Sequence, residues 1–420
     1  MEGFVMNDAG QMPLQGLENT FQERVTMLAL GMGGGGSNMV ANLQRRKPEG
    51  VLFRVADTDE QALRGCSVEG QILLGRETTR GLSTGGDIQL GAQVAESDLA
   101  ELKRLLETVD ILFLFAGMGG GTGSGAAPVI ARLAAQMNVM VISLVSLPFT
   151  CEGKHRREVA EKGSGALRKY SHLLLPMAND LLLQEARPEE TLVRTLQIAD
   201  DWMGATVMAF WRSLYWRGLF NIDLGTLQKT FRRVGGKSLF GFGLGEGEDA
   251  AVEAFRKLVA CPLLRSSEFA AQADRLLIHI VGGPDLQTRH VKFLADEIRH
   301  KFGRSAEITI GAVQSPDFQE MVEVCVLGAT DVDGRRPGPL PEKENPRPQA
   351  MGGRIVSSAG LAEADDQVIL STDSPESGIQ REFPFTSEKS GHFEKTDSNE
   401  FEGENLDTPT FIRRGIKIQV

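Results

Sequence analysis

The sequence predicts an α/β protein with four parts: a parallel-sheet nucleotide-binding domain, a long central helix, a smaller α+β domain and a disordered C-terminal linker. Three observations predict this organisation. Apolar runs of strand length alternate with amphipathic segments from Arg24 to about Leu175. A largely apolar segment then runs unbroken over 191–216. After residue 330 the composition shifts to Pro, Gly, Ser and Glu.

Composition narrows the class of protein. The chain has 420 residues and a formal net charge of −11, without a dominant basic patch, which argues against a nucleic-acid binder. Four scattered cysteines indicate reduced thiols in the cytoplasm, and the six histidines lack metal-ligand spacing. No basic residue precedes Arg24, and no apolar stretch is long enough to span a membrane. We therefore expect a soluble cytoplasmic protein.

The elements follow from local patterns. The predicted parallel strands are Val25–Leu30, Val51–Ala56, Ile111–Phe115, Val139–Leu144 and Leu173–Leu175. In the second domain we expect a helix over 248–260 and strands over 275–281, 305–311 and 322–327. The predicted boundaries are an arm over 1–23, a nucleotide-binding domain over 24–190, a core helix over 191–220, a C-terminal domain over 221–330, a disordered linker over 331–404 and a partner-binding peptide over 405–420.

The glycine-rich run at 116–128, AGMGGGTGSGAAP, is the most informative segment. It lies between an apolar strand and a helix expected at Ala126–Met137. Consecutive glycines let backbone N–H groups face an anion, and the N-terminus of a helix favours phosphate. A flexible linker would not sit between two such elements. The run predicts a phosphate-binding loop.

A second glycine loop, GMGGGGSN at 31–38, follows the first strand. It satisfies GxGxxG, and Asp57 ends the next strand, so a nicotinamide-binding enzyme is an alternative interpretation. That fold needs one such loop, whereas this chain has two, which favours two helix N-termini converging on one phosphate chain.

Six ordered motifs resemble the FtsZ/tubulin family of GTPases. They are GGGGSN at 33–38, ADTDEQAL at 56–63, TTRGLSTGG at 78–86, GMGGGTGSGAAP at 117–128, PFTCEGKHR at 148–156 and GLFNID at 218–223. LDTPTFIRR at 406–414 is similar to the C-terminal peptide of the bacterial FtsZ branch, which tubulins lack. The resemblance implies a GTP-binding protein with Mg²⁺ that forms head-to-tail homopolymers in the cytoplasm, at the division site.

By their place in these motifs, fifteen residues are expected to contact the nucleotide. They are Gly34, Gly35, Gly36, Ser37, Asn38, Gly119, Gly120, Gly121, Thr122, Gly123, Ser124, Glu152, Arg156, Asn179 and Asp200. Asp200 matches the residue that reads the base, and a carboxylate can accept hydrogen bonds from both N1–H and the exocyclic amine of guanine.

Simpler structural roles remain open for some of these residues. Asn38 could cap a helix, Asn179 could be a turn residue, and Glu152 with Arg156 has the spacing of a helical ion pair. Leu196 stands where the family often has a stacking Phe. Asp57 replaces an Asn of the family, which adds negative charge beside phosphate.

Another departure is STGGDIQLG at 83–91, in the segment that senses the γ-phosphate in the family. The resemblance also implies that a loop of the next subunit, N-x-D-x-x-D, completes the catalytic site. Here Asn221 and Asp223 match, but Thr226 replaces the second Asp. A hydroxyl is a poor proton acceptor, so slow hydrolysis is expected. The alternatives are that Asp223 alone suffices, that a nearby carboxylate substitutes for the missing one, or that the protein is a non-hydrolysing structural or regulatory member of the family.

The C-terminal peptide is expected to bind a membrane tether or regulator of the division ring. Its apolar residues are spaced as anchors for a groove, and basic residues follow them.

Overall fold

The computed structural model describes residues 25–46, 48–181, 191–216, 218–265 and 273–330, with two short strands, β11 (Glu400–Phe401) and β12 (Glu404–Asn405). The expected arm and nearly all of the expected linker and C-terminal peptide lie outside the described residues. Contacts divide the chain into one unit up to Pro346 and a second from Arg347 onward. The domains described next belong to the first unit.

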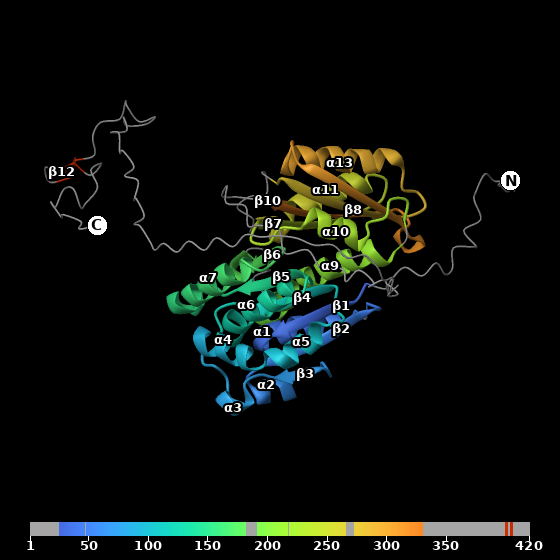
Figure 1. Ribbon diagram of the computed structural model, residues 1–420. Coiled ribbons are helices and arrows are strands. Elements are labelled where there is room, and N and C mark those ends of the chain that lie inside the picture. The colour runs from blue at the N-terminus through green and yellow to red at the C-terminus, as the bar shows by residue number, and fades with distance from the viewer. Residues whose placement is uncertain are drawn as a thin grey trace, which may run out of the picture. The chain divides into compact units, whose positions relative to one another are not determined.

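The first domain is built on a six-stranded parallel sheet (Figure 1). Its strands are β1 (Met27–Met32), β2 (Val51–Asp57), β3 (Gln71–Leu73), β4 (Ile111–Gly117), β5 (Met140–Leu147) and β6 (Leu173–Ala178). Their order in the sheet is β3-β2-β1-β4-β5-β6. The winding direction thus reverses between β1 and β4, where parallel sheets usually bind ligands.

Helices cover both faces of this sheet. They are α1 (Gly33–Gln44), α2 (Glu60–Arg64), α3 (Arg76–Thr79), α4 (Ile88–Ser97), α5 (Leu99–Leu106), α6 (Gly121–Gln136), α7 (Lys154–Arg168) and α9 (Leu192–Tyr215). Along β1, Met27 and Ala29 pack with α1 and α9, whereas Leu28 and Leu30 pack with α4, α5 and α6. Because both faces are buried, the central strands are almost wholly apolar.

The second domain contains a four-stranded mixed sheet in the order β7-β10-β8-β9. Its elements are α10 (Leu224–Thr230), β7 (Lys237–Glu246), α11 (Ala250–Ala260), α12 (Pro262–Arg265), β8 (Arg275–Gly282), α13 (Thr288–Phe302), β9 (Glu307–Gln314), a 3₁₀ turn at Pro316–Phe318 and β10 (Met321–Thr330). The predicted fold class is confirmed. Neither β7 nor α13 was predicted from the sequence, and the short strand β3 of the first sheet was missed as well.

The central helix α9 packs between the domains. Trp202 contacts Phe242 of β7 at 5.7 Å between ring centroids, and Phe210 contacts Phe113 of β4 at 5.6 Å. Arg212 forms an ion pair with Glu323 of β10, whose side chain is 6% exposed. The helix therefore belongs to the cores of both domains, as its apolar sequence predicts.

Candidate functional site

The two glycine loops meet at the carboxyl ends of adjacent strands. β1 pairs with β4 in parallel, with Met32 opposite Ala116, so the chain leaves both strands at the same edge. The loops are in backbone contact, because a Cβ added to Gly35 would lie 3.2 Å from Cα of Gly117. Side chains at these positions would separate the two loops.

Each loop is already the first turn of a helix. α1 begins at Gly33 and α6 at Gly121, so the prediction that the second helix begins near Ala126 is wrong by more than one turn. Neither helix has an N-cap side chain that hydrogen-bonds to its first amides. Their first N–H groups are therefore available to a ligand, and both helix dipoles favour an anion.

A cavity of about 770 Å³ opens at this edge of the sheet. Nine of the expected nucleotide residues line it: Gly34, Gly35, Gly120, Gly121, Thr122, Gly123, Glu152, Arg156 and Asn179. Asp57, Ser83, Thr84, Gly86 and Leu196, which the sequence singled out as departures from the family pattern, line it too. The polar residues that sequence reasoning missed are Asp59, Ser146 and Cys151.

Six expected nucleotide residues are not among those that line the cavity: Gly36, Ser37, Asn38, Gly119, Ser124 and Asp200. For two of them the structure shows another role. Gly36 packs on β4, where a Cβ would collide with the carbonyl oxygen of Phe115. Ser124 is fully buried, and its Oγ accepts a hydrogen bond of 2.9 Å from the amide of Gly119. Gly36 and Ser124 therefore contribute to the conformation and packing of the glycine loops.

Two of the expected nucleotide residues have a buried polar atom without a hydrogen-bond partner among the described residues. The two atoms are Oγ of Ser37 and Oδ1 of Asn179. Asn179 is 7% exposed and lines the cavity. Since an unpaired buried polar atom costs about 1–3 kcal/mol, the Asn179 oxygen is suited to accept a hydrogen bond from a ligand.

Asp57 lies at the end of β2 and is 5% exposed. Its Oδ1 accepts hydrogen bonds from the amides of Thr58 at 2.7 Å and Asp59 at 3.4 Å. Burial raises the pKa of Asp57, and the hydrogen bonds from Thr58, Asp59 and Thr122 oppose that rise. One carboxylate oxygen is thus engaged by the backbone that follows β2.

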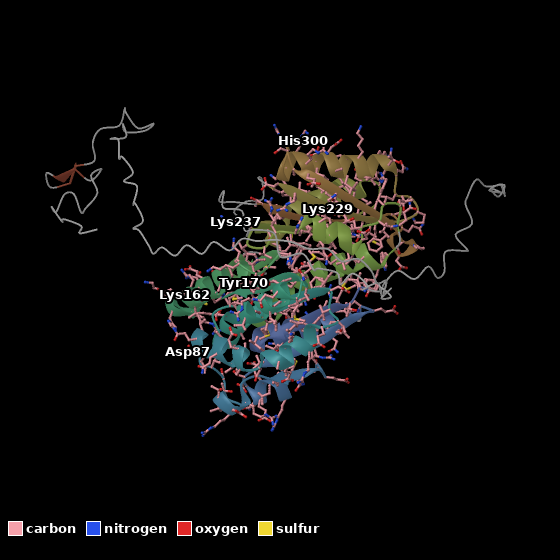
Figure 2. All side chains as sticks on the ribbon, in the orientation of Figure 1. Asp87, Lys162, Tyr170, Lys229, Lys237 and His300 are labelled. Atoms are coloured by element: carbon pink, nitrogen blue, oxygen red, sulfur yellow. The ribbon has the colours of Figure 1, made fainter. Side chains whose placement is uncertain are left out.

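Three threonine hydroxyls meet beside Asp57. Oγ1 of Thr122 lies 3.2 Å from Oγ1 of Thr58 and 3.4 Å from Oγ1 of Thr84. Thr84 belongs to the divergent 83–91 segment, which continues into the N-cap of α4 at Asp87 (Figure 2). This segment is therefore in contact with the glycine loop that precedes α6.

The turn Thr150–Glu152 forms another part of the cavity wall. Glu152 accepts a hydrogen bond from the amide of Phe149 at 2.7 Å and pairs with Nε of Arg156 at 3.1 Å. Glu152 and Arg156 therefore form the helical ion pair that their spacing suggests, and both also line the cavity. The carboxylate of Asp180 accepts hydrogen bonds from the amide of Thr150 at 3.0 Å and from its hydroxyl at 2.5 Å.

The central helix completes the wall with Leu196, which is 38% exposed. Asp200 lies one turn further along the same helix face. Burial, and then the charge of Asp201, raise the pKa of Asp200 to about 7. Asp201 itself pairs with Arg46 at 2.8 Å.

Asn221 and Asp223 lie in the second domain and do not line the cavity. Oδ1 of Asn221 accepts a hydrogen bond from the amide of Gly218, and Asp223 is the N-cap of α10. The neighbouring Phe220 pairs with Ala312 of β9. A role of this loop in chemistry at the cavity would therefore require a second subunit.

Two family models match the chain. "Tubulin/FtsZ family, GTPase domain" matches residues 26–187, and "FtsZ family, C-terminal domain" matches residues 236–333. The cell division protein FtsZ of Rickettsia conorii is 35% identical over 309 residues, which cover 73% of this chain and 68% of the relative. That of Coxiella burnetii is 32% identical over 311 residues, covering 74% and 80%.

A solved structure agrees with these matches. The structure titled FtsZ dimer, empty, from M. jannaschii superposes with a TM-score of 0.66 at 27% identity, covering 74% of this chain and 89% of that one. None of the helices described here is long and apolar enough to cross a membrane. Within the described residues no group of three or more His, Cys, Asp or Glu is arranged to hold a metal ion.

Proposed function

The chain belongs to the FtsZ family of tubulin-like cell division proteins, and from this membership we propose that it binds GTP in the cavity between β1 and β4 and assembles head to tail into filaments. The observation that carries the proposal is the convergence of two uncapped helix N-termini, those of α1 and α6, on one cavity. A single phosphate would need one such terminus, whereas a nucleoside polyphosphate can use both.

Different polar residues of the cavity would contact the phosphates, the nucleoside and the base. The glycine loops with Thr122 would hold the phosphates. Asn179, whose Oδ1 has no partner among the described residues, would contact the nucleoside. Asp200, one turn beyond Leu196, would accept hydrogen bonds from guanine. The strand order is shared with dinucleotide-binding folds, so the second glycine loop and the family membership decide against a nicotinamide enzyme.

The charges of the cavity favour Mg²⁺ as a cofactor. Asp57, Asp59 and Glu152 line it, against the one guanidinium of Arg156. A polyphosphate adds further negative charge, and Mg²⁺ binds through phosphates with one or two carboxylates. When bound, the ion would neutralise charge that develops on the phosphates during hydrolysis.

Hydrolysis is proposed to occur between subunits, with Asn221 and Asp223 of one chain facing the nucleotide of the next. Leu219 and Phe220 support a contact there, because they are 63% and 58% exposed beside Asn221. A head-to-tail contact of this kind does not close and yields a filament. The filament would act at the division site in the cytoplasm, with residues 406–414 binding a tether or regulator.

A second candidate is a family member that co-assembles without useful hydrolysis, which Thr226 favours. Nucleotide released from the purified protein and identified by chromatography tests the main proposal: guanine nucleotide supports it, and a dinucleotide or an empty site in a folded protein refutes it. Phosphate release measured beside electron microscopy with GTP separates the two candidates, because the second predicts assembly without turnover.

A further inference from the structure

We propose that Cys151 is a site of mixed-disulfide formation with low-molecular-weight disulfides, and that the adduct and the nucleotide exclude one another from the cavity. The inference rests on the proposed nucleotide site. It starts from the difference between Cys151 and the other cysteines. Cys151 is exposed and lines the cavity, whereas Cys261 and Cys325 are buried and Cys66 is half-buried outside it.

The backbone on both sides of Cys151 is held in place. Asp180 accepts hydrogen bonds from both the amide and the hydroxyl of Thr150. On the other side, Glu152 accepts a hydrogen bond from the amide of Phe149 and pairs with Arg156. The turn cannot swing out without breaking these contacts, so the thiol stays at the cavity wall.

A separate observation indicates that a ligand binds at this wall. Asn179 precedes Asp180, lines the same cavity, and has a buried Oδ1 without a partner among the described residues. The hydrogen bonds from Thr150 to Asp180 bring the segments that contain Asn179 and Cys151 together. Because Asn179 and Cys151 line the same cavity, a ligand that contacts Asn179 is expected to compete for space with a group attached to Cys151.

The sequence after Cys151 favours the exchange reaction. Three cationic residues, Lys154, Arg156 and Arg157, lie in the first turn of α7. Only two carboxylates, those of Glu152 and Glu158, lie nearby in the sequence. Cationic side chains attract disulfide reagents that carry negative charge. The N-terminus of α7 also lacks a side-chain cap, which adds to the positive potential.

The proposed step is balanced by the disulfide as oxidant. The Cys151 thiol gives its proton to solvent, and the thiolate attacks one sulfur of the disulfide. A new S–S bond forms, the old S–S bond breaks, and the other sulfur leaves as a thiolate with the bonding electron pair. The sulfur of Cys151 is oxidised, and the departing half of the reagent is reduced. A thiol reductant reverses the step.

The test is titration of the full chain with an aromatic disulfide whose leaving thiolate is coloured. We expect one fast thiol in the native chain and in Cys66→Ser, and none in Cys151→Ser. Thermal unfolding of each variant verifies that it is folded. Guanine nucleotide should slow the fast phase in proportion to the fraction of sites occupied, with occupancy measured separately by retention of labelled nucleotide.

The adduct is then tested as a competitor. The modified chain should bind nucleotide at least about tenfold more weakly, since the added group clashes with the ligand, and a thiol reductant should restore binding. A fast thiol that persists in Cys151→Ser overturns the inference. So does an unchanged rate with nucleotide bound at every site. Absence of nucleotide binding to the unmodified chain would refute the proposed function as well, whereas binding without protection refutes the inference alone.

Discussion

The carboxylate of Asp223 accepts a hydrogen bond of 2.6 Å from the amide of Thr226, three residues further along the chain. This bond and a second one from the Thr226 side chain lower the pKa of Asp223. Asp223 is the N-cap of α10, so it is engaged in holding its own helix. Thr226, which stands where the resemblance implies a second carboxylate, therefore hydrogen-bonds the first one, that of Asp223.

Thr226→Asp should raise GTP turnover, because it restores a carboxylate that can accept a proton or offset metal charge. We expect an increase on the order of 10² in phosphate release per subunit, since general-base groups commonly contribute 10²–10⁴. The rate should rise cooperatively with protein concentration if the loop acts across a subunit contact. Thr226→Asn is the matched control, because it has the size of Asp without its charge. Equal rates for both variants, or brisk hydrolysis by the native chain, would refute the explanation.

Asp200 should make guanine-nucleotide affinity pH-dependent. Its pKa of about 7 lies far above the ordinary value, so the carboxylate form, which the proposal requires to accept hydrogen bonds from guanine, predominates only above neutral pH. Affinity should fall as pH drops from about 8 to 6, approaching tenfold per pH unit below the pKa. Fluorescent GDP titrations would measure it. Asp201→Asn removes a neighbouring negative charge and should shift the profile toward acid, whereas a flat profile in the native chain would contradict the assignment.

The same pKa predicts the sign of a stability change in the ligand-free chain. The folded state binds the Asp200 proton more tightly than the unfolded state does. The contribution of Asp200 to stability is therefore lost as pH rises through the window from about 4 to about 7. Asp200→Asn should reduce this slope in urea unfolding without nucleotide. A slope that is identical in the variant would show that Asp200 does not titrate in that window.

Two glycines of the first loop should respond differently to alanine. A Cβ on Gly36 would collide with the carbonyl oxygen of Phe115, whereas a Cβ on Gly34 meets nothing within 4 Å and lies at the cavity wall. Gly36→Ala should lower the free energy of unfolding by about 1–3 kcal/mol. Gly34→Ala should leave the unfolding temperature of the ligand-free protein nearly unchanged and weaken nucleotide binding. Normal nucleotide affinity in Gly34→Ala would contradict a phosphate contact there.

Removing one partner of the largely buried ion pair of Arg212 and Glu323 should be strongly destabilising, because it leaves the other charge buried without compensation. Arg212 also lies over the rings of Trp216 and Phe318, 5.7 Å from each centroid. Glu323→Leu leaves a largely buried guanidinium without its partner, and we expect a loss of about 3–5 kcal/mol in urea unfolding. The double variant with Arg212→Met should recover most of that loss. A double variant as unstable as Glu323→Leu would show that the loss does not come from leaving the Arg212 charge uncompensated.

The sequence predicted the elements whose pattern is local. Five of the six strands of the first sheet and the long helix α9 were predicted to within a few residues, because a strand buried on both faces is an apolar run. The sixth, β3, is too short to form such a run. β7 was missed because glycines interrupt its pattern. The structure explains them: at Gly243 and Gly245 a Cβ would collide with backbone of α11. The missed helix α13 did carry a signal, since Leu294, Ile298 and Phe302 recur at four-residue intervals and are buried.

At the site, the glycine loops were predictable because the residue type itself is informative. It was not predictable which loop residues line the cavity and which pack against the rest of the domain. That Ser124 bonds Gly119 and Gly36 contacts β4 depends on how strands distant in sequence pair. The hydrogen bonds from Thr150 to Asp180 join positions thirty residues apart, and no local pattern marks such a pair. The nucleotide contacts and the boundaries of the terminal segments stay predictions.

The adjacency of β1 and β4 has a consequence for how a newly made chain matures. The cavity is lined by segments that extend from Met32 to Leu196, so a growing chain has no complete site until α9 has emerged and the central strands have paired. A ligand that binds only the folded state stabilises it by about 2.7 kcal/mol at one hundred times its dissociation constant. The cell's guanine-nucleotide pool would therefore act as a folding ligand on finished first domains and leave nascent fragments unassisted.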